Sequence, residues 1–162
     1  MINRLDHFLP IGSLHDNGII VNIQATDLMN EAVDIFVKQI ETTEPASFFV
    51  DKFFPSTNQK VNIKIVITSN DTELKLSTEE KYKLVITSSP TKSETSVYIS
   101  GSSFFGARHA LETLSQLIVW DDTIPALLMV KNAEIRDSPA FPHRGLLIDT
   151  ARNYISVAMI KK

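Results

Sequence analysis

The chain has 162 residues, of which 43% are hydrophobic and 22% are charged, and its formal net charge is -3 at pH 7. These values are ordinary for a soluble globular protein, and they give no support for a nucleic-acid partner because no basic surface dominates. Cysteine is absent, which excludes a disulfide framework and a cysteine-based metal site.

The first part of the chain predicts a strand and a long helix. Residues 1–18 are rich in turn formers, so we expect an irregular N-terminal segment. Residues 19–23 form a short apolar run that predicts a first strand. The next residues, from about 27 to 42, have apolar side chains at helical spacing after a possible N-cap, which predicts a helix with one face on a sheet. Residues 45–60 contain four phenylalanines, which favour a segment held against the core over the alternative of an aromatic sugar platform.

Three strands follow in the middle of the chain. Apolar and polar residues alternate most clearly in 61–68, and the same pattern recurs in 82–86 and 97–100. The polar loop between the last two favours antiparallel pairing. The charged run Glu79-Glu80-Lys81 is expected to face solvent.

A second helix is predicted over 104–118, and a short strand over 127–130. Residues 135–142 contain two prolines and predict an extended linker. The resulting element order predicts an α/β fold of the α+β layer type, a mixed sheet with two helices on one face.

Near the C-terminal end of the chain lies the segment Phe141-Pro142-His143-Arg144-Gly145-Leu146-Leu147-Ile148-Asp149-Thr150-Ala151-Arg152-Asn153-Tyr154. Its apolar run, flanked by charges, predicts a strand buried on both faces, as in parallel sheets and barrels. Residues 156–162 resemble the first turns of a helix. A strand and a partial helix form the first half of a β/α unit, so we expect the chain to be a fragment.

The usual catalytic and metal motifs are missing from the sequence. The turn after Gly101 lacks the second glycine of a nucleophile elbow, and the four histidines form no metal-binding motif. The adjacent carboxylates Asp121-Asp122 and Glu79-Glu80 are weak candidates for acid–base chemistry. Asn70 begins the sequon for N-glycosylation. We therefore expect no catalytic residue, metal or cofactor within this chain.

Arg144 and Asp149 are the remaining candidates. Residues five apart on a strand point to opposite faces, so these two side chains should not pair with each other. The guanidinium of Arg144 suits a hydroxyl-rich ligand or a carboxylate. The alternative is a structural ion pair with a carboxylate elsewhere in the barrel.

The 141–154 segment closely resembles the opening of the catalytic barrel in β-N-acetylhexosaminidases, glycoside hydrolase family 20. Residues 106–117 (GARHALETLSQL) resemble the last helix of that family's non-catalytic N-terminal domain, and 82–86 fit one of its strands. The resemblance divides the chain into an irregular segment (1–18), an N-terminal α/β domain (19–138) and the start of a (β/α)8 barrel (139–162).

The resemblance implies that the full-length parent removes terminal β-linked N-acetylglucosamine or N-acetylgalactosamine from glycans or chitooligosaccharides. The substrate's acetamido oxygen acts as nucleophile, and the catalytic Asp-Glu pair lies beyond Lys162. Arg144 corresponds to the family's sugar-binding arginine, and we assign Asp149 and Arg152 to supporting positions near it. We expect this chain alone to be inactive.

The resemblance also implies a secreted, lysosomal or membrane-associated parent, although residues 1–7 have no signal-peptide core. Homodimers are common in the family. The alternative function is a non-catalytic carbohydrate-binding or structural accessory domain, in which the terminal strand only closes the fold.

Overall fold

A computed structural model describes residues 8–11, 19–22, 26–43, 60–89, 94–124 and 126–161. The first elements are β1 (Phe8–Ile11), β2 (Ile19–Asn22), α1 (Thr26–Thr43), β3 (Lys60–Ile67), β4 (Tyr82–Ser88) and β5 (Glu94–Gly101). They are followed by α2 (Phe104–Gln116), β6 (Ile118–Asp121), β7 (Ala126–Val130), β8 (Asn132–Asp137) and the short α3 (Val157–Ile160). The four phenylalanines between positions 48 and 54 lie outside the described residues, so both interpretations of that segment stay predictions.

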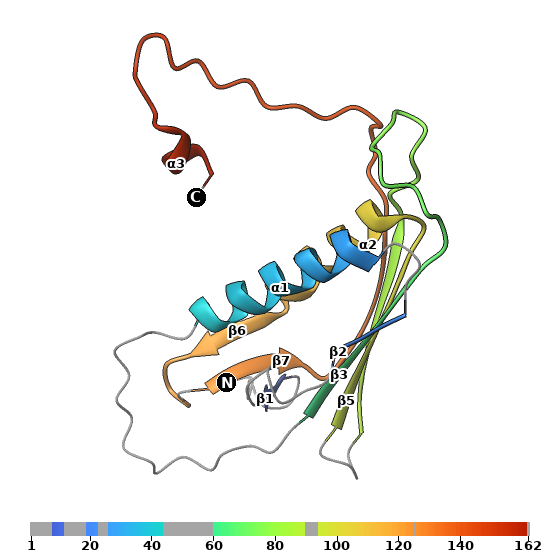
Figure 1. Ribbon diagram of the computed structural model, residues 1–162. Coiled ribbons are helices and arrows are strands. Elements are labelled where there is room, and N and C mark those ends of the chain that lie inside the picture. The colour runs from blue at the N-terminus through green and yellow to red at the C-terminus, as the bar shows by residue number, and fades with distance from the viewer. Residues whose placement is uncertain are drawn as a thin grey trace.

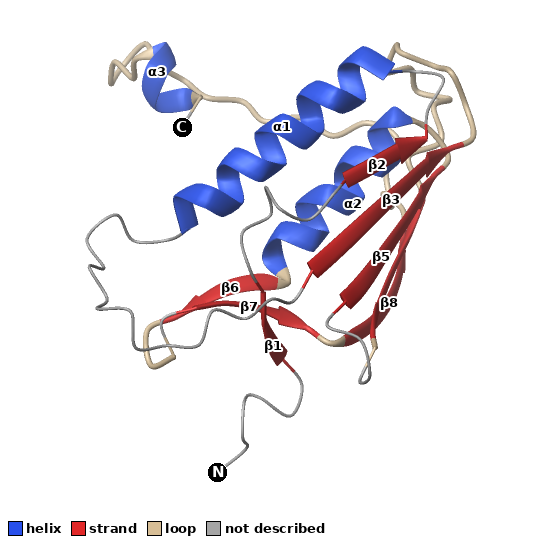
Figure 2. Cartoon of the chain, turned by 60° about the horizontal axis from the view of Figure 1, so that its bottom comes forward, coloured by secondary structure: helices blue, strands red, loops and turns tan. Residues whose placement is uncertain are grey.

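The larger sheet is mixed and has the strand order β2-β3-β5-β4-β8. β2, β3 and β5 are parallel, whereas β4 runs antiparallel to both of its neighbours, β5 and β8. Helices α1 and α2 lie side by side on one face of this sheet (Figure 1; Figure 2). The prediction of a mixed sheet with two helices on one face is therefore confirmed.

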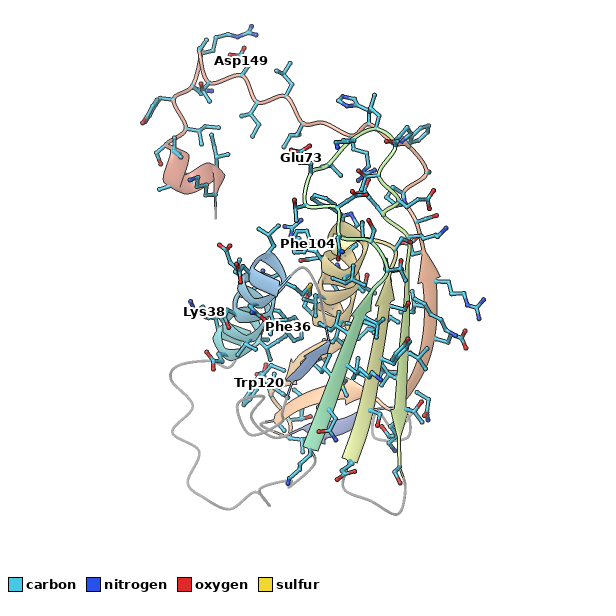
Figure 3. All side chains as sticks on the ribbon, turned by 45° about the vertical axis from the view of Figure 1, so that its right-hand side comes forward. Phe36, Lys38, Glu73, Phe104, Trp120 and Asp149 are labelled. Atoms are coloured by element: carbon cyan, nitrogen blue, oxygen red, sulfur yellow. The ribbon has the colours of Figure 1, made fainter. Side chains whose placement is uncertain are left out.

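The period-two alternation of the strands explains why only one face of the sheet is covered. In β3, the side chains of Val61, Ile63 and Ile65 are buried, while Asn62 and Lys64 between them are exposed. Phe36 points from α1 toward the sheet and is buried there (Figure 3). The core therefore lies between the sheet and the helices, and its central side chains are Met29, Phe36, Ile65, Leu84, Ile99, Ala107, Ala110 and Leu114.

A second, smaller sheet has the order β1-β7-β6, with antiparallel pairing throughout. The strand predicted at 127–130 forms as β7, but it belongs to this sheet. Only Lys131 separates β7 from β8, and its carbonyl accepts hydrogen bonds from the backbone amide and the hydroxyl of Ser88. The chain thus crosses from one sheet to the other at a single residue. β1 lies within the segment that was expected to be irregular.

The linker predicted over 135–142 was partly wrong, because β8 forms the edge strand beside β4. Ala133 and Ile135 point toward the core, and Asn132, Glu134 and Arg136 alternate with them on the exposed side. Charged side chains on an edge strand discourage pairing with another chain. The strand was not predicted because of its high charge content, although the alternation of apolar and polar residues was present in the sequence.

Residues 138–156 form no strand, so the strand expected at Leu146–Ile148 is absent from this structure. A strand needs a hydrogen-bonded neighbour, and neither sheet provides one there. This segment runs away from the sheet as an extended chain that ends in α3 (Figure 1). The side chain of Ser156 caps α3 by accepting from the amide of Met159. No helix in the described ranges is both long and apolar enough to cross a membrane.

The contrast between two leucines tests this description of the core. Leu84 is 0% exposed and Leu147 is 94% exposed. Leu84→Ala should lower the free energy of unfolding by about 2–5 kcal/mol, because it leaves a cavity in the core. Leu147→Ala should change it by less than about 0.5 kcal/mol. Urea denaturation of both variants measures the difference, and equal losses would contradict the assignment of the core.

Candidate functional site

The first turn of α2 packs directly against residues 79–81, the segment that leads into β4. Ser103 caps the helix, since its side chain accepts from the amide of Gly106, and its hydroxyl donates to the Glu79 carbonyl at 2.7 Å. The amide of Ser102 donates to the Lys81 carbonyl at 3.0 Å. A Cβ atom on Gly106 would lie 2.5 Å from that same carbonyl oxygen. Glycine is therefore required at this position for close approach of two backbones.

The sheet order brings the C-terminal segment to the same place. β8 runs antiparallel to β4, and the register pairs Asp137 with Tyr82. The segment that follows β8 therefore begins beside Tyr82, the first residue of β4, and close to Glu80. This placement explains how Arg144 reaches a residue 64 positions earlier in the sequence.

Glu80, His109 and Arg144 form one cluster, which we call the Glu80 cluster. The carboxylate of Glu80 is buried, with only 6% of the side chain exposed. Its Oε2 atom lies 2.8 Å from His109 Nε2 on α2, and it accepts a hydrogen bond from Arg144 Nη2 at 2.6 Å. Arg144 Nη1 donates to the carbonyl of Phe141, also at 2.6 Å. One carboxylate oxygen thus joins the strand lead-in, the second helix and the C-terminal segment.

The environment of Glu80 favours the ionised form of its carboxyl group. Burial raises its pKa, but the hydrogen bonds and positive charges of Arg144 and His109 together outweigh burial and hold the pKa below the ordinary value of 4.5. The ionised carboxylate can therefore accept from both partners at neutral pH. An isolated buried carboxylate would be costly, and the two donors offset that cost.

The prediction that Glu79-Glu80-Lys81 faces solvent was wrong for its central residue. Glu79 and Lys81 are exposed and form an ion pair at 3.0 Å, whereas Glu80 points inward. The signal was present in the alternation of β4: Glu80 is two residues before Tyr82, which puts it on the same face as the buried Tyr82, Leu84 and Ile86. His109, one of the four histidines that form no metal-binding motif, is a member of this cluster.

The structure places Arg144 in an ion pair, the alternative that the sequence left open. Its partner, Glu80, lies in the sheet domain and not in the expected barrel segment. Arg144 and Asp149 do not pair in this structure, but residues 138–156 form no strand here, so the argument from strand spacing stays a prediction. The side chain of Arg144 remains 42% exposed, so its contact with Glu80 does not enclose it.

Asp149 lies on the C-terminal segment, away from the larger sheet and from α1 and α2 (Figure 3), and it forms an ion pair with Arg152. Arg152 Nη2 donates to Asp149 Oδ2 at 2.9 Å, and the amide of Ala151 donates to Asp149 Oδ1 at 2.9 Å. The backbone hydrogen bond from Ala151, followed by the one from Arg152, lowers the pKa of the Asp149 carboxyl. The two residues form a local turn there, and their supporting role beside Arg144 stays a prediction.

Two other sequence candidates have different surroundings. Asn70, the predicted glycosylation site, is exposed in the loop between β3 and β4. Asp121, a weak acid–base candidate from the sequence, is the last residue of β6, and its buried carboxylate accepts from the amides of Thr123 and Ile124 and from the Thr123 hydroxyl. Asp121 therefore holds the turn after β6. Within the described ranges, no group of three or more His, Asp or Glu side chains could hold a metal ion.

Glu80→Gln tests the charge of the cluster through its pH dependence. A carboxyl with a lowered pKa in the folded state stabilises the fold above its ordinary pKa, and this stability is lost as the pH falls through the folded value. At pH 7 the variant should be less stable by about 1–2 kcal/mol, the contribution of a charged hydrogen bond beside half-exposed partners. The difference in the free energy of unfolding between the wild type and Glu80→Gln should disappear below pH 4.5.

Glu79→Gln is the matched control, since Glu79 is the exposed neighbour and should change stability by less than about 0.5 kcal/mol. Urea denaturation across the pH range measures all three proteins. If the stability difference between Glu80→Gln and the wild type grew on acidification, the lowered pKa of Glu80 would be contradicted.

Gly106→Ala tests the packing of α2 on residues 79–81. The added methyl group would meet the Lys81 carbonyl, so the helix must shift away from the strand lead-in. We expect a loss of about 1–3 kcal/mol from this overpacking. The Nε2 resonance of His109 should also move, because the shift separates it from Glu80. An unchanged histidine resonance in a stably folded variant would show that the close contact does not position the cluster.

Comparison with known proteins identifies the family. The family model described as beta-acetyl hexosaminidase like matches residues 14–117. A chitooligosaccharidolytic beta-N-acetylglucosaminidase of Bombyx mori is 38% identical over 140 residues, covering 86% of this chain and 23% of that protein. A probable beta-hexosaminidase of Drosophila melanogaster is 40% identical over 117 residues, covering 72% of this chain and 17% of that protein.

Solved structures share the fold. A chitobiase of Flavobacterium johnsoniae superposes with a TM-score of 0.65 at 22% identity, over 95% of this chain and 22% of that one. A GH20 exo beta-N-acetylglucosaminidase of Vibrio harveyi, in complex with N-acetylglucosamine, superposes with a TM-score of 0.61 at 22% identity. The match covers 96% of this chain and 20% of that one. The chain spans less than a quarter of the length of these curated relatives. Because the family model covers more than half of it, the chain belongs to the beta-acetyl hexosaminidase-like family.

Proposed function

We propose that this chain is the N-terminal part of a retaining exo-β-N-acetylhexosaminidase. In this proposal residues 19–138 are the non-catalytic α/β domain, and residues 139–162 open the catalytic (β/α)8 barrel. The observation that carries the proposal is that the family-matched region, residues 14–117, is followed after β6, β7 and β8 by the 141–154 segment, which contains Arg144. The helical turn that begins at Val157 supports a β/α unit there.

The exposure of the C-terminal segment supports a barrel strand that lacks its neighbours. Leu146 and Leu147 are almost fully exposed here, whereas a barrel strand is buried on both faces and rich in such side chains. An apolar run of this kind is stable only when other strands cover it. The proposal therefore assigns these leucines to the contact with the rest of the barrel.

The names of the relatives support a substrate class for the proposed parent. The Bombyx mori protein is named chitooligosaccharidolytic, and the Vibrio harveyi structure contains N-acetylglucosamine. We assign chitooligosaccharides and other glycans with terminal N-acetylhexosamine as substrates of the parent. The substrate's acetamido oxygen would attack the anomeric carbon, and an Asp-Glu pair in the rest of the barrel would orient it and transfer protons. No residue of this chain takes either role, and no cofactor is needed.

Arg144 is the residue of this chain that we assign to the sugar. A guanidinium is always charged and presents several N–H donors in one plane, which suits a pair of neighbouring hydroxyl groups. In the proposed parent, Asp149 and Arg152 lie further along the same strand and support its end. Glycosylation of the exposed Asn70, a secreted or lysosomal location and a homodimeric parent belong to the same proposal.

The second candidate is a non-catalytic carbohydrate-binding or structural accessory domain. The observation in its favour is the ion pair of Arg144 with Glu80, which gives the arginine a structural role inside this chain. In that case Arg144 would stabilise the fold and would not contact a sugar. The two candidates therefore differ in what removal of Arg144 does.

The test compares this chain with the same chain continued through its downstream coding sequence. Purified residues 1–162 should not hydrolyse a chromogenic N-acetyl-β-glucosaminide, and the longer protein should. Arg144→Ala in the longer protein should lower kcat/KM by about 100-fold, the loss of roughly two charge-assisted hydrogen bonds. Arg108→Ala on the exposed side of α2 is the control and should keep full activity. Full activity of Arg144→Ala, or hydrolysis by residues 1–162 alone, would contradict the proposal.

A further inference from the structure

Glu80 occupies an unusual position between the sheet domain and the segment that carries the sugar-binding candidate. It lies inside the range matched by the family model, whereas Arg144 lies outside that range. The hydrogen bond between their side chains is nevertheless one of the shortest in the described residues, at 2.6 Å. A buried acceptor that holds a partly exposed arginine can fix where that arginine points.

Helix α2 fixes the carboxylate in turn. His109 Nε2 contacts the same oxygen that Arg144 binds, and His109 is anchored on a helix whose first turn is bonded to Glu79 and Lys81. Because the carboxylate is 6% exposed and is held from the helix side, it has little freedom to follow the arginine. The arginine must therefore adapt to the carboxylate, and not the reverse.

The contacts of Arg144 leave donors for a ligand. A guanidinium has five N–H groups. Within the described part of the chain, one on Nη1 goes to the Phe141 carbonyl and one on Nη2 to Glu80. The other three N–H groups have no hydrogen-bond partner among the described residues, and the side chain is 42% exposed. Arg144 can thus be held by Glu80 and bind sugar hydroxyls at the same time.

From these contacts we infer that Glu80, held by His109, is a positioning residue for Arg144, so that the N-terminal domain orients a sugar-binding group of the barrel. The inference rests on the proposed function, because it requires Arg144 to contact the sugar. Glu80 itself touches no substrate. It acts by fixing the plane of the guanidinium, and its loss would leave Arg144 present but free to rotate.

A double-mutant cycle in the longer, active protein tests the inference. Glu80→Gln should lower kcat/KM by roughly tenfold, about the effect of one weakened charge-assisted hydrogen bond, and mainly through a higher KM. In the Arg144→Ala background the same substitution should have no further effect, because the residue it positions is gone. Glu79→Gln should leave both constants unchanged. His109→Gln provides a second route to the same readout and is used if Glu80→Gln does not fold.

The outcomes separate the inference from the function on which it rests. If Arg144→Ala keeps full activity, the proposed function fails, and the inference fails with it. If Arg144→Ala loses activity but Glu80→Gln does not, or if the two effects multiply, only the inference is overturned. A Glu80→Gln effect that vanishes in the Arg144→Ala background supports it, because a merely structural role would persist there.

Discussion

The contact between residues 79–81 and the first turn of α2 determines the geometry of this domain. Ser102, Ser103 and Gly106 bring helix backbone and strand lead-in so close that a methyl group would not fit between them. This contact sets the angle at which α2 crosses the sheet, and the buried face of α2 then defines the core. It also directs Glu80 toward His109. The same few backbone contacts therefore govern both the packing of the helix and the only buried glutamate in the described residues.

The strand order adds the third member of the Glu80 cluster. Since β8 is the edge strand beside β4, the chain leaves the sheet next to Glu80, and Arg144 binds it a few residues later. A single carboxylate thus links an N-terminal domain to the segment that resembles the opening of a barrel. Under the proposed function, this link would let the N-terminal part of the chain orient Arg144, a group that the proposal assigns to the sugar.

Much of the fold followed from local sequence patterns. Helix α1 was predicted from about 27 to 42 and spans Thr26–Thr43, and β3 lies within one residue of its predicted bounds. Both have strong periodicity, which needs no knowledge of the rest of the chain. The second sheet could not be found in this way, because which strands pair depends on contacts between distant segments. In β8, the charges that suit an exposed edge hid the alternation of Ala133 and Ile135.

The sequence predicted only part of the candidate site. Arg144 was singled out from its chemistry, and the family resemblance added its sugar-binding role, but its partner was missed because Glu80 was interpreted as part of a solvated charge run. The alternation that continues back from Tyr82 would have pointed to it; the arginine that binds it is 64 positions away and could not be inferred. The most direct test of the account is the pKa of Glu80, measured by NMR titration of its side-chain carboxyl carbon in the wild-type chain and in Arg144→Met. The account predicts a value below 4.5 in the wild type and a higher value in the variant, where burial acts against one donor fewer. A wild-type value at or above 4.5, unchanged by the substitution, would contradict it.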